Sequence, residues 1–425
     1  MRYKKTQLKN GSSLVILQIP SSSSVTISAY IKAGYRYDPL NKPGLAHFTE
    51  HMLFTGTRKY PTHRDLARVI EKYGGFHMAF TWIDYQNHYI RFPRQQFKLG
   101  AEILLDTLFQ STILVEELEK EKGVVEEEIR RNLSDPAKAI WSYVWLPHFF
   151  QGTALSKPYT GTSKDVDSFT RNDVTQFINS HFQPDEIVYL LAGDVEEKEA
   201  KDVFENILIK GLYRQNKKII PSIEPKVDER VVVRTQESDY ISLIFAIPTV
   251  SIYSKERHPL EILKNILARG FSGSLPDKLR NHGGLIYTWY STQDNHYDTG
   301  YLLFQTATSK KNMPDVIKII LDEFRRIGQG KIKDEEIEIS KSNLTGNLLT
   351  NMETGTDYIH WYALQELYAL TPVLHIQDQI KIYKNISKKE ILDVAKRYFS
   401  PDRIYIAGCG NIYQSEIEKI RTHYV

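Results

Sequence analysis

Two histidines and a glutamate stand in the pattern His-x-x-Glu-His at residues 47–51. If this segment is helical, His47 and His51 leave the same face one turn apart, because residues i and i+4 are neighbours on a helix. Two neutral imidazoles on one face can hold one zinc ion. Glu50 lies beside that face, where its carboxylate can take a proton from water at the metal. The pattern therefore predicts a hydrolytic zinc site.

A hydrolytic zinc site usually takes three protein ligands and leaves one position for water. A carboxylate is favoured as the third donor, because the only cysteine, Cys409, is far away along the chain. The segment 116–129 is rich in glutamate and predicts a helix. Its buried side is predicted from three apolar residues at helical spacing: Leu118, Val125 and Ile129. Most of its glutamates are interpreted as a solvated face, although Glu121 and Glu128 are two turns apart on one side.

The segment 44–57 resembles the signature of the pitrilysin, insulysin and mitochondrial-processing-peptidase family of inverted zinc peptidases. In that family the third zinc ligand is a glutamate in a helix of the form Glu-x-x-x-Val-x-x-Glu, and residues 121–128 match this form. The resemblance implies that Glu128 is the third ligand and that Glu121 is an acid assisting beside the metal. It also implies a zinc peptidase that acts on peptides and unfolded chains.

The chain repeats itself at an offset of 217 residues (399 minus 182). Four identical pairs share this offset: Phe182 and Phe399, Pro184 and Pro401, Asp185 and Asp402, and Gly193 and Gly410. The same offset places residues 54–57 on residues 271–274. The repeat predicts two copies of one α+β domain, at residues 1–212 and 229–425, joined by a polar linker at 213–228.

The second copy lacks the proposed zinc ligands. At the same offset, His47, Glu50, His51 and Glu128 correspond to Lys264, Leu267, Ala268 and Thr345. The scaffold therefore does not need the histidines for folding, which favours a chemical role for them. One zinc ion per chain is expected.

Strand-like segments occupy corresponding places in the two copies. Residues 13–17 and 24–31 predict strands before the motif helix, and residues 230–234 and 241–246 take those places in the second copy. Strands beside segregated helices indicate the α+β class. The family resemblance implies that each domain is an antiparallel sheet with helices packed on one face.

A strand that could bind substrate follows the motif helix. Residues 74–81 resemble the family's edge strand, Gly-x-x-x-Asn-Ala-x-Thr, with Ala79 and Thr81 matching and Met78 replacing the asparagine. A peptide can add to such an exposed edge as one more strand. The resemblance implies that Ala79, Phe80 and Thr81 bind substrate, and an ordinary paired strand is the alternative.

Arg280 and Tyr287 are seven residues apart across a glycine-containing turn in the second copy. In the family, an arginine and a tyrosine at this spacing contact substrate near the scissile bond, where they suit a developing oxyanion. A surface ion pair and an aromatic at the rim of the core are the alternatives. In family members of this half length, two chains close a chamber, so a homodimer is expected, with Arg280 and Tyr287 acting in trans. A heterodimer with a related chain is also possible.

Composition excludes several other classes of function. The 425 residues carry 55 basic and 52 acidic side chains, a net charge of +3, which gives no case for nucleic acid or for a membrane surface. No run of 18 apolar residues occurs, and the basic N-terminus is not followed by the apolar region of a signal peptide. The single cysteine fits a reducing compartment, so a cytoplasmic location is expected.

Two functions compete on these observations. The leading hypothesis is a zinc metalloendopeptidase that uses Glu50 as general base inside a closed chamber. The alternative is a non-catalytic or partner-dependent subunit of a heteromeric processing peptidase, since the family contains such chains. Non-catalytic chains are expected to have lost ligands, whereas His47, His51 and Glu128 are all present here.

Overall fold

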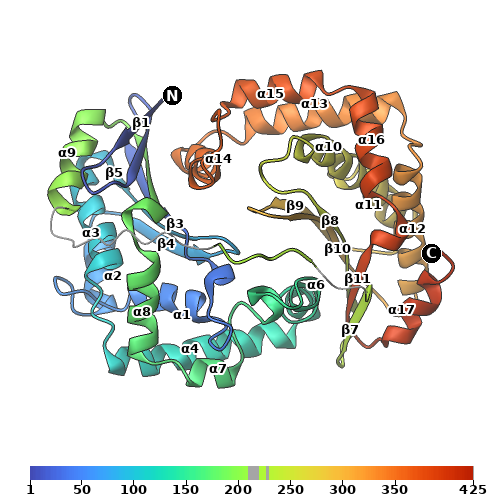
Figure 1. Ribbon diagram of the computed structural model, residues 1–425, viewed down its shortest axis with the longest axis horizontal. Coiled ribbons are helices and arrows are strands. Elements are labelled where there is room, and N and C mark those ends of the chain that lie inside the picture. The colour runs from blue at the N-terminus through green and yellow to red at the C-terminus, as the bar shows by residue number, and fades with distance from the viewer. Residues whose placement is uncertain (209–219, 226–228, 425) are drawn as a thin grey trace. The chain divides into compact units, whose positions relative to one another are not determined.

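The computed structural model describes residues 1–208, 220–225 and 229–424, so the predicted linker at 213–228 lies largely outside the described residues. The chain forms two compact units (Figure 1). Unit 1 comprises Met1–Ile129, Tyr159–Pro221 and Met352–Val373; unit 2 comprises Arg130–Pro158, Ser222–Asn351 and Leu374–Val425. The units differ from the predicted domains 1–212 and 229–425, because each half of the chain contributes one helical segment to the other half's sheet.

Unit 1 is built on a six-stranded sheet with the strand order β1-β2-β6-β3-β5-β4. Its strands are β1 (Arg2–Gln7), β2 (Ser13–Gln18), β3 (Ser24–Ile31), β4 (Phe76–Thr81), β5 (Gln86–Pro93) and β6 (Ile187–Gly193). Neighbouring strands are antiparallel, except that β2 and β6 are parallel. This parallel pair differs from the expected all-antiparallel sheet. Parallel strands need a long connection, and β6 follows β5 only after a long helical segment. The strands predicted at 13–17 and 24–31 are β2 and β3.

Helices and short turns of helix surround this sheet. They are η1 (Tyr35–Tyr37), α1 (Leu45–Leu53), α2 (His63–Lys72), η2 (Arg94–Gln96), α3 (Phe97–Phe109), α4 (Val115–Ser134), α7 (Ser163–Asp167), α8 (Arg171–His181), η5 (Pro184–Glu186), α9 (Glu197–Leu208) and α14 (Gly355–Leu367). Helices α2, α7 and α8 each begin at a threonine whose hydroxyl pairs with an aspartate three residues on. These capping boxes satisfy amide groups that would otherwise lack partners, so they fix where each helix starts.

Both faces of the central strands of unit 1 are covered. Every residue of β6 is buried, which requires apolar neighbours on both sides of the sheet. One face packs against α3, where Gly100 lies close to Ile27 of β3. The other face packs against α14, a helix from the second half of the chain, through Tyr30, Ile359 and Tyr362. The expectation of helices on one face is therefore incomplete, because α14 covers the second face.

Unit 2 is built on a five-stranded sheet with the order β7-β11-β8-β10-β9, in which only β7 and β11 are parallel. Its strands are β7 (Val231–Thr235), β8 (Ile241–Thr249), β9 (Trp289–Asn295), β10 (Gly300–Thr308) and β11 (Tyr405–Gly410). Its helices and turns are α5 (Pro136–Ala139), η3 (Ile140–Trp145), α6 (Leu146–Phe149), η4 (Ala154–Ser156), α10 (Arg257–Ala268), α11 (Ser274–Pro276), η6 (Asp277–His282), α12 (Met313–Gly328), α13 (Asp334–Thr350), α15 (Ile376–Asn385), α16 (Lys388–Tyr398), η7 (Pro401–Arg403) and α17 (Gln414–Arg421). The strands predicted at 230–234 and 241–246 are β7 and β8.

The exchange of helical segments is reciprocal. Unit 2 receives residues 136–149 from the first half of the chain, and at the offset of 217 these correspond to residues 353–366, which include most of α14. The ring centre of Trp145 lies 4.8 Å from that of Tyr301 on β10, and that of Phe149 lies 4.8 Å from that of Tyr405 on β11. The side chains next to Tyr301 along β10 point to the opposite face of the sheet, where they belong to the large apolar core between the sheet and the helices of unit 2. Each sheet is thus covered on its second face by the equivalent helix of the other repeat.

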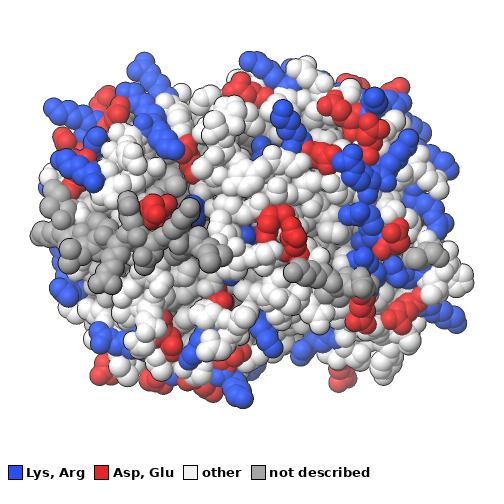
Figure 2. All heavy atoms as spheres, viewed as in Figure 1, with Lys and Arg blue, Asp and Glu red and all other residues white. Residues whose placement is uncertain are grey.

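The surface carries mixed charge. Figure 2 shows basic and acidic side chains interspersed over the face in view, in keeping with the near balance of 55 and 52 in the sequence. No helix within the described ranges combines the length and apolar character needed to cross a bilayer.

Candidate metal centre

The motif helix α1 directs both histidines of the pattern to one side. Its N-terminus is held by Asp38, whose carboxylate accepts hydrogen bonds from the backbone N–H groups of Gly44 and Ala46 at 2.8 and 2.7 Å. Burial raises the pKa of Asp38 to about 8, although these two hydrogen bonds act against the increase. Most of α1 is buried, which leaves little freedom for the helix to shift. The imidazole ring centres of His47 and His51 are 4.7 Å apart, as one helical turn predicts.

Helix α4 supplies the acidic partners. Leu118 and Val125 are buried and seven residues apart, and each is followed three residues later by a glutamate of the predicted pair, Glu121 or Glu128. Because the helix repeats almost exactly after two turns, both glutamates lie at the border of the same buried stripe. The spacing therefore places both carboxylates where they can meet α1.

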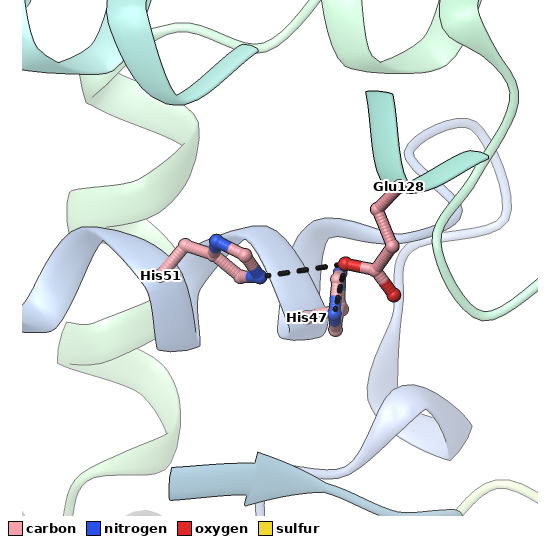
Figure 3. A group of neighbouring side chains, drawn as sticks. All are labelled: His47, His51 and Glu128. Atoms are coloured by element: carbon pink, nitrogen blue, oxygen red, sulfur yellow. Dashed lines mark ion pairs between the residues drawn. The ribbon is translucent and has the colours of Figure 1, made fainter. Parts of the chain in front are cut away.

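The two histidines and Glu128 point toward one another (Figure 3). Glu128 Oε2 lies 3.6 Å from His47 Nε2 and 3.8 Å from His51 Nε2, and the three ligand atoms lie within 4.8 Å of one another. Ligands about 2.0–2.2 Å from a tetrahedral zinc ion are themselves about 3.3–3.6 Å apart. Two imidazoles and one carboxylate are also a donor set of hydrolytic zinc sites. The residues therefore fit zinc, and no other group of histidine, cysteine, aspartate and glutamate within the described ranges is spaced to hold a metal.

The electrostatics of His47 agree with a ligand role, and those of His51 reflect the carboxylates around it. Burial lowers the pKa of His47 well below its usual value, and the neighbouring charge of His51 acts in the same direction. His47 is thus kept neutral, as a metal ligand must be. Burial also acts to lower the pKa of His51, but its hydrogen bond with Glu121 and the charges of Glu50, Glu121 and Glu128 raise it overall.

Glu121 contacts His51 rather than the place of the metal. Its Oε2 atom lies 3.2 Å from His51 Nδ1, the ring nitrogen that faces away from Glu128. A carboxylate on the second nitrogen of a histidine ligand fixes the ring orientation and raises the basicity of the ligand. The structure therefore brings Glu121 to the site as a support for His51.

The side chain of Glu50, on α1, reaches strand β4. Thr81 Oγ1 donates a hydrogen bond of 2.5 Å to Glu50 Oε2. Burial raises the pKa of Glu50, and the charge of Glu128 adds to the increase, whereas the Thr81 hydrogen bond and His51 act against it. A general base works best when its pKa approaches the working pH, so this direction suits the role. The side chain of Thr81 was not predicted to contact Glu50, because the two are 31 residues apart on different elements.

Strand β4 is the edge strand of its sheet, as the family resemblance implies. The backbone N–H of Trp82 donates to Tyr85 O in the turn that joins β4 to β5. Since backbone groups alternate in direction along an antiparallel pair, the N–H groups of Ala79 and Thr81 point away from β5. No strand within the described ranges pairs with that edge. The outward backbone groups of β4 are therefore open to pairing with a further strand. Met78, in place of the family asparagine, is 45% exposed.

Arg280 and Tyr287 are brought together in unit 2. The guanidinium carbon of Arg280 lies 4.9 Å from the ring centre of Tyr287, and Arg280 Nη1 donates to Ile286 O at 3.4 Å. Tyr287 is 77% exposed, whereas Arg280 is half-buried. The two side chains contact each other, and they belong to a different unit from His47, His51 and Glu128.

Two further residues lie at the site without any indication in the sequence: Asp38 and Tyr159. Asp38 holds the start of α1, and the Tyr159 hydroxyl lies 3.2 Å from Glu128 Oε1. Neither residue stands at a recurring spacing from the motif, so no periodic signal reveals it. The glycine at position 44 is the one related feature of the sequence: in the structure its φ is 86°, a backbone conformation that favours glycine, at the turn that leads into α1.

Two family models match the chain in succession. Residues 14–163 match insulinase, peptidase family M16, and residues 168–344 match the peptidase M16 inactive domain. The first model covers the segment that holds His47, His51 and Glu128, and the boundary between the two models lies within the first copy of the repeat. The fold and the family models define the class of protein: a member of a family of zinc peptidases. The chain belongs to peptidase family M16, the family of pitrilysin and insulysin, in its short form.

Relatives and solved structures agree with this assignment. The chain is 26% identical over 351 residues to the uncharacterized zinc protease YmxG of Bacillus subtilis, covering 83% of this chain and 85% of that protein. It is 26% identical over 407 residues to an uncharacterized zinc protease of Rickettsia bellii, covering 94% and 95%. A protease from Helicobacter pylori shares the fold with a TM-score of 0.87 at 18% identity, over 96% of this chain and 99% of that one. A peptidase M16 inactive domain from Pseudomonas fluorescens has a TM-score of 0.87 at 16% identity, over 97% and 98%.

Proposed function

We propose that this chain is a zinc metalloendopeptidase that hydrolyses peptides or unfolded polypeptide segments. The observation that carries the proposal is the convergence of His47, His51 and Glu128, with Glu50 beside them. The alternative, a chain without catalytic activity, is disfavoured because the complete set of ligands has its supporting groups in place. The single buried cysteine, Cys409, agrees with a cytoplasmic location.

The proposed mechanism assigns a separate task to each group. His47, His51 and Glu128 would hold one zinc ion. When bound, the ion would act as a Lewis acid on the scissile carbonyl and would lower the pKa of its water towards about 7. Glu50 takes a proton from the attacking water on its carboxylate and returns it to the leaving amine. Glu121 orients His51, and the hydroxyl of Thr81 orients Glu50.

Substrate binding is assigned to a strand edge and to an exposed pair. The open edge of β4 at Ala79, Phe80 and Thr81 binds the peptide backbone as an added strand. Arg280 and Tyr287 supply a guanidinium and a phenol to the oxyanion that forms at the carbonyl. In this proposal two chains form a closed chamber, so each zinc site is completed by Arg280 and Tyr287 of the second chain.

Cleavage of a peptide library by the zinc-loaded protein tests the proposal. The wild-type chain is expected to cleave a subset of the library, and Glu50→Gln is expected to lower the rate by about 100- to 10,000-fold, because an amide cannot accept the proton of water. Glu50→Gln should keep its zinc, since Glu50 is not a ligand. Near wild-type cleavage by Glu50→Gln would contradict the mechanism. Activity that arises only when a related chain is added would favour the partner-dependent alternative.

A further inference from the structure

The two carboxylate oxygens of Glu128 have different partners. Oε2 faces the two imidazoles, at 3.6 Å from His47 Nε2 and 3.8 Å from His51 Nε2. Oε1 accepts a hydrogen bond from the hydroxyl of Tyr159 at 3.2 Å. A carboxylate can turn about its terminal bond and offer a metal either oxygen or both. The Tyr159 bond engages one oxygen and thereby leaves Oε2 for the metal.

Tyr159 also contacts a second ligand. Its ring centre lies 5.3 Å from that of His47, with an interplanar angle of 86°, so the two rings meet edge to face. This geometry is favourable for aromatic pairs and restricts rotation of the imidazole. The contact is notable because His47 Nδ1 is buried and has no hydrogen-bond partner, whereas His51 Nδ1 has Glu121. The Tyr159 ring therefore packs against the ligand that lacks a polar support.

The backbone around Tyr159 is held against the motif helix. Gly161, two residues on, lies so close to Gly44 at the start of α1 that a Cβ atom on Gly44 would stand 2.4 Å from Gly161 N. Both glycines have positive φ, 86° and 70°, which other residues rarely adopt. Thr162 then begins α7 with a capping box to Asp165. The segment that carries Tyr159 is thus fixed to the helix that carries the two histidines.

We propose that Tyr159 is a positioning residue, which holds Glu128 so that a single oxygen is presented to zinc and which braces the ring of His47. The proposal rests on the proposed function, because it concerns the zinc ligands. It assigns one side chain to the support of ligands from two elements, α1 and α4. Neither the motif nor the family resemblance points to this residue.

Zinc affinity of purified protein tests this role directly, by competition with a chromophoric chelator and independently of activity. Tyr159→Phe removes only the hydroxyl, so the dissociation constant for zinc is expected to rise about 10- to 100-fold. With Co²⁺ in place of zinc, Tyr159→Phe should also change the visible absorption, which reports the number and arrangement of ligands. Thermal unfolding in the presence of chelator should be unchanged, because the ring and its packing remain.

Two control variants separate this role from general effects. Tyr89→Phe also removes a tyrosine hydroxyl in unit 1, one that contacts Met78 Sδ at 3.4 Å, and should leave zinc affinity unchanged. Thr81→Val removes a hydroxyl from Glu50, which is not a ligand, and should likewise leave zinc affinity unchanged. Equal zinc affinity of Tyr159→Phe and wild type would overturn the positioning role alone. A loss of metal-free stability that accounts for the weaker binding would also overturn it. A wild-type chain that binds no zinc would overturn the proposed function as well.

Discussion

At the scale of single residues, three of the groups proposed for the reaction have a hydrogen-bonding neighbour that fixes their orientation. His51 has Glu121, Glu128 has Tyr159, and Glu50 has Thr81. Ligands and bases held in this way lose less freedom when substrate arrives, which is what preorganisation requires. The family resemblance implies an assisting role for Glu121, but its contact with His51, like the other two pairs, is visible only in the structure.

The Thr81 hydroxyl is expected to matter for turnover. Thr81→Val removes a hydrogen bond to a charged group, worth about 1.5–3 kcal/mol, so kcat should fall about 10- to 100-fold. KM and zinc content should stay close to wild type, because neither the strand backbone nor a ligand changes. Thr81→Ser keeps the hydroxyl and should restore most of the activity. Steady-state kinetics of the three proteins measure this, and equal kcat values for Thr81→Val and wild type would contradict the role.

At the scale of elements, the position of β4 at the edge of its sheet decides where substrate can bind. The N–H of Ala79 points away from β5, into the space that an added strand would occupy. The side chain of Thr81, on the same strand, reaches Glu50. One strand therefore aligns the peptide and orients the base.

Ala79→Pro tests the edge of β4. Proline removes the outward N–H and places its ring where the added strand would lie, so kcat/KM should fall by at least about tenfold. Ala79→Ser keeps the N–H and a small side chain and should retain activity. Zinc content should be the same in both variants. Wild-type kcat/KM in Ala79→Pro would show that peptide does not add to this edge.

Much of the element order could be predicted, because it depends on local pattern. The strands at 13–17 and 24–31, the motif helix and the acidic helix all occur, since periodicity and apolar spacing determine them. The packing of α14 against the sheet of the other repeat could not be predicted. Its apolar residues form no clear stripe along one face of the helix, so the sequence does not indicate which sheet it covers. The unbroken apolar sequence of β6, all of which is buried in the structure, is the feature that indicates a sheet covered on both faces. Tyr159 and Asp38 depend on loop paths, which no spacing in the sequence encodes.

At the scale of the whole molecule, the chemistry is divided between the repeats. The residues proposed as metal ligands occur in the first copy, and Arg280 and Tyr287 occur in the second, in a different compact unit. The family resemblance implies pairs of chains at this length, and closed two-fold symmetry is the commonest way for one chain type to assemble. We therefore expect a dimer in which the arginine of one chain serves the zinc site of the other.

Mixing of inactive variants tests this shared site. Glu50→Gln chains and Arg280→Ala chains should each have low activity, and Arg280→Ala should keep its zinc, because it acts on the transition state. In a mixed dimer, the Arg280→Ala chain contributes an intact Glu50 and the Glu50→Gln chain contributes an intact Arg280, so one site per dimer recovers. Peptide hydrolysis after subunit exchange measures this recovery. No recovery, with exchange demonstrated by labelled chains, would rule out action in trans.

The central claim is that His47, His51 and Glu128 hold a zinc ion that peptide hydrolysis requires. Titration of the metal-free wild-type chain with zinc, with hydrolysis followed at each addition, tests it most directly. Activity is expected to rise from background and level off at one zinc per chain, because only the first copy carries the proposed ligands. Glu128→Gln, titrated in parallel, should lose most of its zinc and its activity. Hydrolysis by the metal-free protein, or full zinc occupancy in Glu128→Gln, would contradict the account.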